Sequence, residues 1–237
     1  MALIDVGAID LTIVVPAFNE GGNVGVVIER TLRTLDAGSF AGAFEIIVVD
    51  DGSTDETGAI ADGVAAREPR VIVVRRQANG GFGAAVRDGY ALARGTYVTI
   101  IPADGEVDVD EALKLLAIVD GADVVVSRRL RDLGQHREWL TRSFHWLTRR
   151  LTGFDPTGMD GIFVIRRDVL QQIPLHSTTG LVNNELLMHC VRRRCTMRSG
   201  TMQTNPRISG VSKVVNARTM AKILWELLTL RWLGGTR

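Results

Sequence analysis

Cysteines are few in this chain of 237 residues, net charge is small, and long apolar runs are lacking. The two cysteines, Cys190 and Cys195, lie in a basic stretch at a spacing that suits neither a zinc site nor a disulfide framework. We therefore expect reduced thiols and a cytoplasmic protein. The first ten residues lack the basic start and apolar run of a signal peptide. No window approaches the ~18 consecutive apolar residues of a membrane-spanning helix.

The formal charge of +1 excludes a polyelectrolyte but hides a local cluster. Seven arginines fall between Arg128 and Arg150, against only Asp132 and Glu138. Such a cluster is typical of a solvated helical face, or of a surface that meets phosphates or anionic lipid headgroups. A nucleic-acid interface would need basic residues interleaved with aromatic ones along one face, and this segment has only a faint version. We expect no nucleic-acid partner.

Apolar, β-branched runs alternate with helical patterns in the first half of the chain. The runs begin at residues 11, 44, 71 and 96, and the helical patterns cover about 24–35, 55–66 and 83–93. Ser53 and Thr54 are expected to cap the second of these helices. Strands that are apolar on both faces and separated by helices predict a parallel sheet covered by helices on each side.

The pattern is less regular after Glu106. It predicts helices at 110–119, 139–151 and 183–194, and strands at 122–129 and from 161. A final helix over 214–233 has a broad apolar face, which either packs on the body or lies in a membrane interface. The length suits one domain with two functional halves, about 10–106 and 107–213, followed by this helix.

Polar side chains follow three of the predicted strands, at the point where each strand ends. They are Asn19, Glu20, Asp50, Asp51, Asp104 and Glu106. Ligands of parallel sheets bind beyond the carboxyl ends of the strands. Helix capping accounts for one or two of these residues, but three strand ends that bring carboxylates to one rim predict a ligand site.

Several motifs now support a family resemblance. VVPAFNE, VVDDGSTDET, NGGFGAAVRDGYALARGTYVTIIPADGE and RISGVSK resemble, in this order, family 2 glycosyltransferases of the GT-A fold. The resemblance covers residues 11 to about 213 and is greatest to the polyprenyl-phosphate sugar transferases of the dolichol-phosphate mannose synthase type. It implies a mostly parallel central sheet flanked by helices. The implied activity is that of an inverting hexosyltransferase using a GDP- or UDP-linked hexose or N-acetylated hexosamine.

The donor site is expected at the first loop and at the glycine turn. Carboxylates suit the hydrogen-bond donors of a base and ribose, so Glu20 and Asp51 are expected to accept from them, with Pro16 and Phe18 closing around the base. The turn at residues 80–83 opens a helix, where free N–H groups are expected to meet an anion unless the glycines serve only flexibility. With the positions that the resemblance implies, the expected donor-binding residues are Pro16, Phe18, Glu20, Asp50, Asp51, Gly81, Gly83, Asp104 and Arg128.

Asp104 is the expected centre of the chemistry. The family usually has two aspartates around one residue here, whereas this chain has Pro102-Ala103-Asp104, so the first aspartate is missing. Asp104 and Glu106 remain to hold Mg²⁺ or Mn²⁺, with donor phosphates and water completing an oxygen shell. The ion would stabilise the departing nucleoside diphosphate.

Acidic residues of the second half are candidates for catalysis near the acceptor. The segment DPTGMDGIFVIRR resembles the family's acidic segment and leaves Asp155 and Asp160 as alternatives, while Glu185 matches an acidic position on a helix facing the sugar. A hydroxyl acceptor requires one of these carboxylates as general base, but a lipid phosphate is already ionised and requires none. The expected catalytic residues are therefore Asp104, Glu185, Asp160 and Asp155.

Cations in the second half are expected to bind phosphate. Arg129 follows a predicted strand, and Arg207, Ser212 and Lys213 belong to RISGVSK, which resembles the family's phosphate loop. If these cations converge, they suit an anionic acceptor or the pyrophosphate of the donor. The alternative is that Arg207 and Lys213 are ordinary surface charges. The implied acceptor is a polyprenyl phosphate, reached by peripheral contact with the cytoplasmic membrane face.

Three other functions compete with this one. The same donor chemistry could serve a soluble hydroxyl acceptor, such as a small metabolite or natural-product intermediate. A non-catalytic nucleotide-binding scaffold would be favoured by loss of Asp104 or Glu185, but both are present. A dinucleotide-dependent oxidoreductase is disfavoured because PAFNEGGN lacks the glycine fingerprint directly after the first strand.

Overall fold

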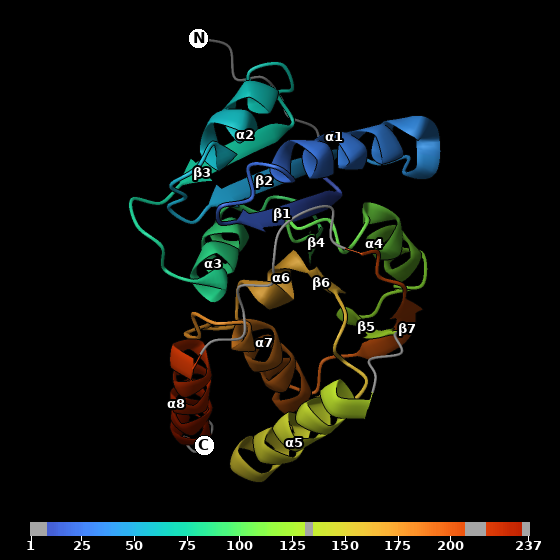
Figure 1. Cartoon of the computed structure of the whole chain (residues 1–237). Coiled ribbons are helices and arrows are strands. Elements are labelled where there is room, and N and C mark those ends of the chain that lie inside the picture. Colours follow the sequence, from blue (N-terminus) through green and yellow to red (C-terminus); the bar gives the residue numbers. More distant parts are fainter. Residues whose placement is uncertain (1–8, 131–134, 207–216, 234–237) are drawn as a thin grey trace.

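A seven-stranded sheet lies at the centre of the computed structural model, which describes residues 9–130, 135–206 and 217–233 (Figure 1). The strands pair in the order β3-β2-β1-β4-β6-β5-β7. Strand β6 is antiparallel to both neighbours and the other pairs are parallel, which confirms the mostly parallel sheet. The strands are β1 (Leu11–Ala17), β2 (Phe44–Asp50), β3 (Val71–Arg75), β4 (Tyr97–Ile100), β5 (Val124–Arg129), β6 (Phe163–Arg166) and β7 (Met197–Met202).

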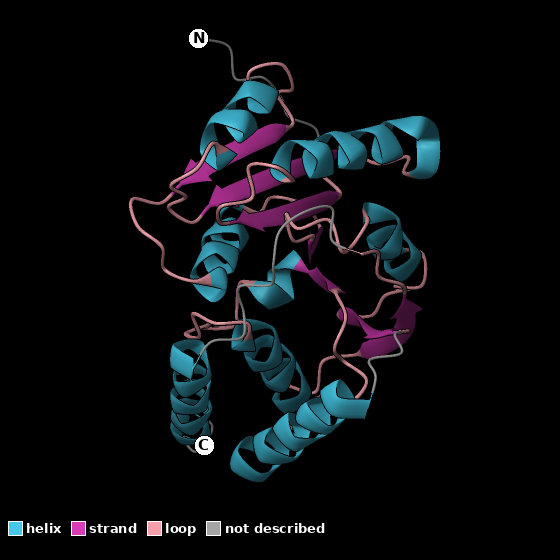
Figure 2. Ribbon diagram, in the orientation of Figure 1, coloured by secondary structure: helices cyan, strands magenta, loops and turns pink. Residues whose placement is uncertain are grey.

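Helices cover both faces of the sheet, as the apolar strands predict (Figure 2). They are α1 (Val24–Thr34), α2 (Thr57–Ala65), α3 (Phe82–Leu92), α4 (Val109–Leu116), α5 (Gln135–Thr152), α6 (Arg167–Leu170), α7 (Leu181–Arg192) and α8 (Ala217–Leu233), with a short π-helical turn η1 (Leu35–Ser39) after α1. Figure 1 shows α5, α7 and α8 gathered on the side of the molecule away from α1 and α2.

The sheet separates two apolar cores. Every residue of β1 and β2 is buried, and successive side chains on a strand point to opposite faces. Ile13 and Val48 therefore pack in the core beneath α1, α2 and α4, whereas Val14 and Ile47 pack in the core shared with α3 and α7. Burial on both faces explains why these runs are continuously apolar and easy to recognise.

One local prediction was wrong, and one strand was not predicted. Helix α2 begins at Thr57 without a side-chain cap, because Ser53 Oγ instead accepts the N–H of Asn19 at 2.9 Å, and Thr54 N donates to Asn19 Oδ1 at 2.8 Å. Strand β7 was not predicted, because its sequence MRSGTM is largely polar and only its last residue is buried. It pairs with β5 at the edge of the sheet, where one face needs no apolar side chains.

The last helix, α8, shows the first of its two expected arrangements, packing on the body, over part of its apolar surface. Leu227 and Leu230 are buried against the body, so the helix packs back on the domain. Its other face leaves Met220, Leu224, Trp225 and Leu228 exposed. Among the described residues, no helix has both the length and the apolar character that crossing a membrane requires.

Candidate active site

A cavity of about 940 Å³ opens beyond the carboxyl ends of the parallel strands. One side, which we call the first wall, is formed by Pro16, Phe18, Glu20, Asp51, Asn79 and Gly81. The opposite side, the second wall, is formed by Phe144, Thr178, Thr179, Gly180, Leu181, Asn183, Asn184, Thr219, Lys222 and Ile223. Asp104 and Arg129 line the cavity as well, at the ends of β4 and β5.

The first wall is held by hydrogen bonds between the loops after β1 and β2. The N–H of Asn19 donates to Ser53, that of Glu20 to Thr57 Oγ1 at 2.7 Å, and that of Gly21 to Asp55 at 3.1 Å. Asn19 has a φ of 51°, a left-handed conformation that asparagine tolerates better than most residues. Polar residues after β2 thus shape the loop that carries Phe18 and Glu20.

Asp51 joins the first loop region to the glycine turn. Its buried carboxylate accepts the N–H groups of Gly80 at 2.9 Å and Gly81 at 2.8 Å, and lies 2.9 Å from Arg76 Nε. Burial raises the pKa of Asp51, although these donors oppose the shift. The amides of this turn were expected to be free to bind an anionic substrate. For Gly80 and Gly81 this prediction is wrong, because both amides donate to the carboxylate of Asp51.

Gly83 and Asp50 do not line the cavity. Gly83 is buried, and its N–H donates to Thr178 O at 2.9 Å. A side chain at this position would collide with the carbonyl of Ser177. Asp50 points to the other side of the sheet, accepts the N–H of Ser53 at 2.9 Å and lies 3.8 Å from Arg75 Nε. Both were expected to bind the donor, and the structure gives them internal partners instead.

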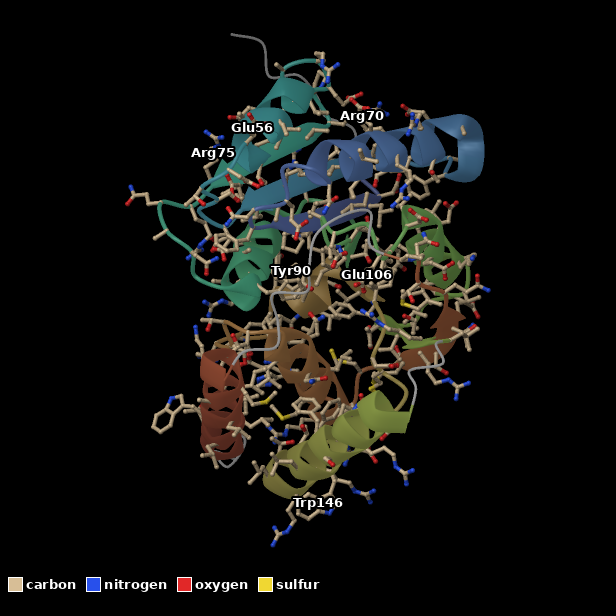
Figure 3. All side chains as sticks on the ribbon, viewed as in Figure 1. Glu56, Arg70, Arg75, Tyr90, Glu106 and Trp146 are labelled. Atoms are coloured by element: carbon tan, nitrogen blue, oxygen red, sulfur yellow. The ribbon has the colours of Figure 1, made fainter. Side chains whose placement is uncertain are left out.

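Asp104 and Glu106 differ in position although they are two residues apart. Asp104 lines the cavity and accepts the N–H of Glu106 at 3.1 Å. Glu106 does not line it, and its carboxylate lies 3.6 Å from Arg129 Nη1. Figure 3 labels Glu106 near the middle of the molecule. Among the described residues, no three His, Cys, Asp or Glu side chains are grouped as a metal site, so the protein offers an ion one cavity-lining carboxylate here, with Glu106 nearby.

Of the two arginines at the end of β5, only Arg129 lines the cavity. Its backbone N–H and its Nε donate to Asp160, to Oδ1 at 3.2 Å and to the carbonyl at 2.8 Å. Arg128 is exposed and does not line the cavity, since neighbouring residues of a strand face opposite ways. The expected donor contact by Arg128 is therefore wrong for this structure.

The three acidic residues expected near the acceptor do not reach the cavity. Asp160 is exposed and bonded to Arg129; Asp155 is exposed beside Arg149, and hydrogen bonds from Thr157 lower the pKa of Asp155. Glu185 is fully buried and accepts the N–H groups of His176 and Ser177, so it does not face a sugar. Helix α7 instead presents Asn183 and Asn184 to the cavity.

Residues that the sequence did not indicate form much of the second wall. Thr178 and Thr179 are held by Glu226 of α8, and Lys222 lies one helical turn before it. Any signal in the sequence was weak, because these residues lie in segments without a strand end or a motif. The expected phosphate-binding residues Arg207, Ser212 and Lys213 lie outside the described residues.

Comparison with known proteins places this geometry in a family. Residues 12–174 match the model of Glycosyl transferase family 2. The chain is 34% identical over 177 residues to a polyprenol monophosphomannose synthase of Mycolicibacterium smegmatis, covering 69% of this chain and 64% of that relative. It is 30% identical over 209 residues to the uncharacterized glycosyltransferase Mb0553 of Mycobacterium bovis, covering 86% and 89%.

Among solved structures, the fold is similar to that of a Mycobacterium tuberculosis enzyme. Glucosyl-3-phosphoglycerate synthase, in complex with Mn²⁺, uridine diphosphate and glucosyl-3-phosphoglycerate, superposes with a TM-score of 0.67. The sequences are 21% identical, and the match covers 92% of this chain and 80% of that chain. This likeness shows a shared fold.

Proposed function

Since this chain belongs to glycosyl transferase family 2 and is a glycosyltransferase, we propose that it transfers a sugar from a GDP- or UDP-linked donor to a polyprenyl phosphate. The relatives named as polyprenol monophosphomannose synthase and as dolichyl-phosphate beta-glucosyltransferase support this acceptor class. An oxygen of the acceptor phosphate attacks C1 of the sugar while the bond from C1 to the diphosphate breaks. A single in-line displacement inverts the anomeric carbon.

One observation carries the choice of acceptor: the second wall has cationic and amide groups but no carboxylate among its described residues. The carboxylates that line the cavity in the described part of the chain are Glu20, Asp51 and Asp104, none of which belongs to that wall. A hydroxyl acceptor needs a base to remove its proton as it attacks, whereas a phosphate oxygen is already ionised. Lys222 of this wall suits an anion, as does Arg129, which lines the same cavity.

The first wall suits the nucleoside of the donor. Pro16 and Phe18 provide an apolar surface for a planar base, while Glu20 and Asp51 provide oxygen acceptors for the N–H and O–H groups of base and ribose. The diphosphate would then extend towards Asp104 and Arg129. Arg129 contributes positive charge where the leaving group develops negative charge.

Asp104 fits a divalent cation, because a carboxylate oxygen at the cavity surface is the ligand that Mg²⁺ and Mn²⁺ prefer, and Mg²⁺ commonly uses one or two carboxylates with substrate phosphates. The bound ion supplies charge neutralisation for the departing diphosphate. The related fold that holds Mn²⁺ and uridine diphosphate supports this assignment. Glu106 would act from beside Asp104, through the ion or through Arg129.

A membrane surface is proposed as the place where the acceptor is met. Met220, Leu224, Trp225 and Leu228 form the exposed apolar face of α8, and Trp146 is exposed at 67% on α5, which packs against α8. Figure 3 shows Trp146 on the outer side of α5. Arg142, Arg149 and Arg150 are exposed on the same helix, and arginines beside tryptophans suit an anionic lipid surface.

Calorimetric titration with GDP-mannose, UDP-glucose and UDP-N-acetylglucosamine tests the donor site. We expect one donor to bind in the presence of Mn²⁺ or Mg²⁺, and both the chelator and the Asp104→Ala substitution to abolish binding. If none of these three donors binds, the proposal is contradicted for this set of sugar nucleotides.

A matched pair of lipids tests the acceptor. Polyprenyl phosphate and the corresponding polyprenol differ only in the phosphate, so transfer to the first alone supports the base-free mechanism. Transfer to the polyprenol, or to a soluble hydroxyl compound in preference to the lipid phosphate, would contradict it. The anomeric configuration of the product, read by nuclear magnetic resonance, tests inversion.

A further inference from the structure

Two buried carboxylates hold four consecutive backbone amides beside the cavity. Glu185 accepts the N–H groups of His176 at 3.0 and 3.1 Å and of Ser177 at 2.8 Å. Glu226 accepts the N–H groups of Thr178 at 2.9 Å and Thr179 at 3.3 Å. We call residues 176–179 the clamped segment.

Glu226 makes more hydrogen bonds to this segment than are needed to attach α8 to the body. Besides the two amides, it accepts the hydroxyl groups of Thr178 at 2.8 Å and Thr179 at 2.6 Å, so each carboxylate oxygen receives one amide and one hydroxyl. Its residue is only 9% exposed. Burying a charged group is costly unless hydrogen bonds compensate, and apolar residues such as Leu227 already attach the helix to the body.

The clamped segment also contacts the helix that opens with the glycine turn. Thr178 O accepts the N–H of Gly83 at 2.9 Å, and Arg87 Nη1 donates to the carbonyl of His176 at 3.0 Å. Helices α3, α7 and α8 therefore meet at one short stretch of backbone. That stretch places Thr178 and Thr179 in the second wall.

We propose that Glu226 is a positioning residue for the acceptor: it fixes the clamped segment and the inner face of α8 as one surface of the cavity. Lys222 and Ile223 lie on that inner face, about one turn before Glu226, and both line the cavity. Docking of Glu226 onto the two threonines therefore sets where the cation of Lys222 meets an anionic substrate. This inference rests on the proposed transfer to a phosphate acceptor.

The donor side has its own support. Gly80 and Gly81 are held by Asp51, which belongs to the first wall and makes these bonds without Glu226. Loss of the Glu226 contacts should therefore displace the acceptor wall while leaving the donor site in place. The proposal thus predicts a separation between acceptor KM and donor affinity, which a general loss of stability would not produce.

Glu226→Gln is the informative substitution, because an amide has the size of the carboxylate but presents its NH₂ group to a backbone N–H. With a water-soluble short-chain polyprenyl phosphate, we expect the acceptor KM to rise roughly tenfold, the effect of losing one hydrogen bond to a charged group. The donor dissociation constant should change less than about twofold. Glu226→Asp, which keeps the charge but retracts the carboxylate, should give a smaller rise and serves where the glutamine variant does not fold.

Glu45→Gln is the matched stability control. Glu45 is another buried carboxylate, bonded to Thr12 and Arg94 away from the cavity, so its substitution should lower the melting temperature without changing the acceptor KM. Hydrogen exchange adds a readout without substrate: the amides of Thr178 and Thr179 should exchange faster in Glu226→Gln, while those of Gly80 and Gly81 stay protected.

If the wild-type enzyme is active, either of two results would overturn the inference. One is an unchanged acceptor KM in a folded Glu226→Gln variant, and the other is a donor dissociation constant that rises by the same factor as the acceptor KM. Absence of transfer by the wild-type protein would instead overturn the proposed acceptor chemistry on which the inference rests. The wild-type assay therefore separates failure of the function from failure of the positioning role.

Discussion

The two walls of the cavity are built in different ways. The first wall follows the ends of adjacent parallel strands, and its loops are tied to one another by side chains of residues 51–57. The second wall is assembled from three parts: α5, the clamped segment with the helix α7 that follows it, and α8. These parts are separate in sequence and meet only in the folded chain. One wall therefore depends on sheet topology and the other on how helices dock.

The walls also differ in charge. The first wall carries the carboxylates Glu20 and Asp51, while the described residues of the second wall include Lys222 and the amides Asn183 and Asn184. Two acidic residues of the second half, Glu185 and Glu226, are buried and serve as internal hydrogen-bond acceptors. The carboxylates of the first wall suit the hydrogen-bond donors of a nucleoside. The cationic and amide groups of the second wall suit the anionic oxygens of an acceptor phosphate.

The largest effect is expected at Asp104, which lines the cavity but belongs to neither wall. Asp104→Asn keeps the shape of the side chain but removes its charge, and we expect kcat to fall roughly 10²- to 10³-fold because charge on the leaving group is less well stabilised. Steady-state assays across a Mn²⁺ titration measure this loss. Glu106→Gln, whose side chain does not line the cavity, should cost less, and an equal loss would show that both carboxylates hold the ion.

Asp51 tests the first wall. Asp51→Asn replaces one acceptor oxygen by a donor opposite the amides of Gly80 and Gly81, and we expect donor affinity to fall by about tenfold to a hundredfold in calorimetry. The acceptor KM should change little. A variant that binds donor normally would show that Asp51 supports neither the turn nor the nucleoside.

The pH dependence of donor binding follows from the same residue. Burial raises the pKa of Asp51, so its carboxylate takes up a proton at a higher pH than an exposed aspartate does. Since the protonated form loses acceptor capacity, donor affinity should fall as the pH is lowered through that range. Calorimetry over a series of decreasing pH values measures the fall, and Asp51→Asn should remove this component of the pH dependence.

Lys222 tests the second wall. Lys222→Met keeps an unbranched side chain without charge, and we expect the acceptor KM to rise roughly tenfold with donor affinity unchanged. Lys114→Met, on the exposed surface of α4, is the matched control. If both substitutions had the same effect, overall charge rather than a specific contact would explain the result.

The smallest effect on the isolated protein is expected at the outer face of α8. Trp225→Ala should change stability by no more than about 0.5 kcal/mol, because the side chain is 68% exposed, but it should reduce cosedimentation with anionic vesicles. Leu227→Ala on the buried face should instead cost about 2–5 kcal/mol of unfolding free energy. Unchanged vesicle binding by the Trp225 variant would exclude this face from membrane contact.

How far the site could be predicted differs between the walls for a physical reason. Pro16, Phe18, Glu20, Asp51, Gly81 and Asp104 line the cavity as expected from their places after strands and in motifs. Glu185 does not, because a helical pattern identifies a helix without saying which of its polar residues faces a ligand and which faces a neighbouring loop. Thr178 and Thr179 were missed because their partner, Glu226, lies far along the chain.

The sequence by itself determined the parallel strands of the first half and the rim of the sheet where the first wall lies. Short, continuous runs of β-branched apolar residues between turn signals favour buried central strands, and the polar residues that follow them emerge at one edge of a parallel sheet. Tertiary structure alone decided the second wall and the orientation of each carboxylate. Packing decides that Asp51 and not Asp50 faces the cavity, and that Asn184 and not Glu185 does. The side of a strand or helix that packs against the body sets the direction of the other side chains on that element.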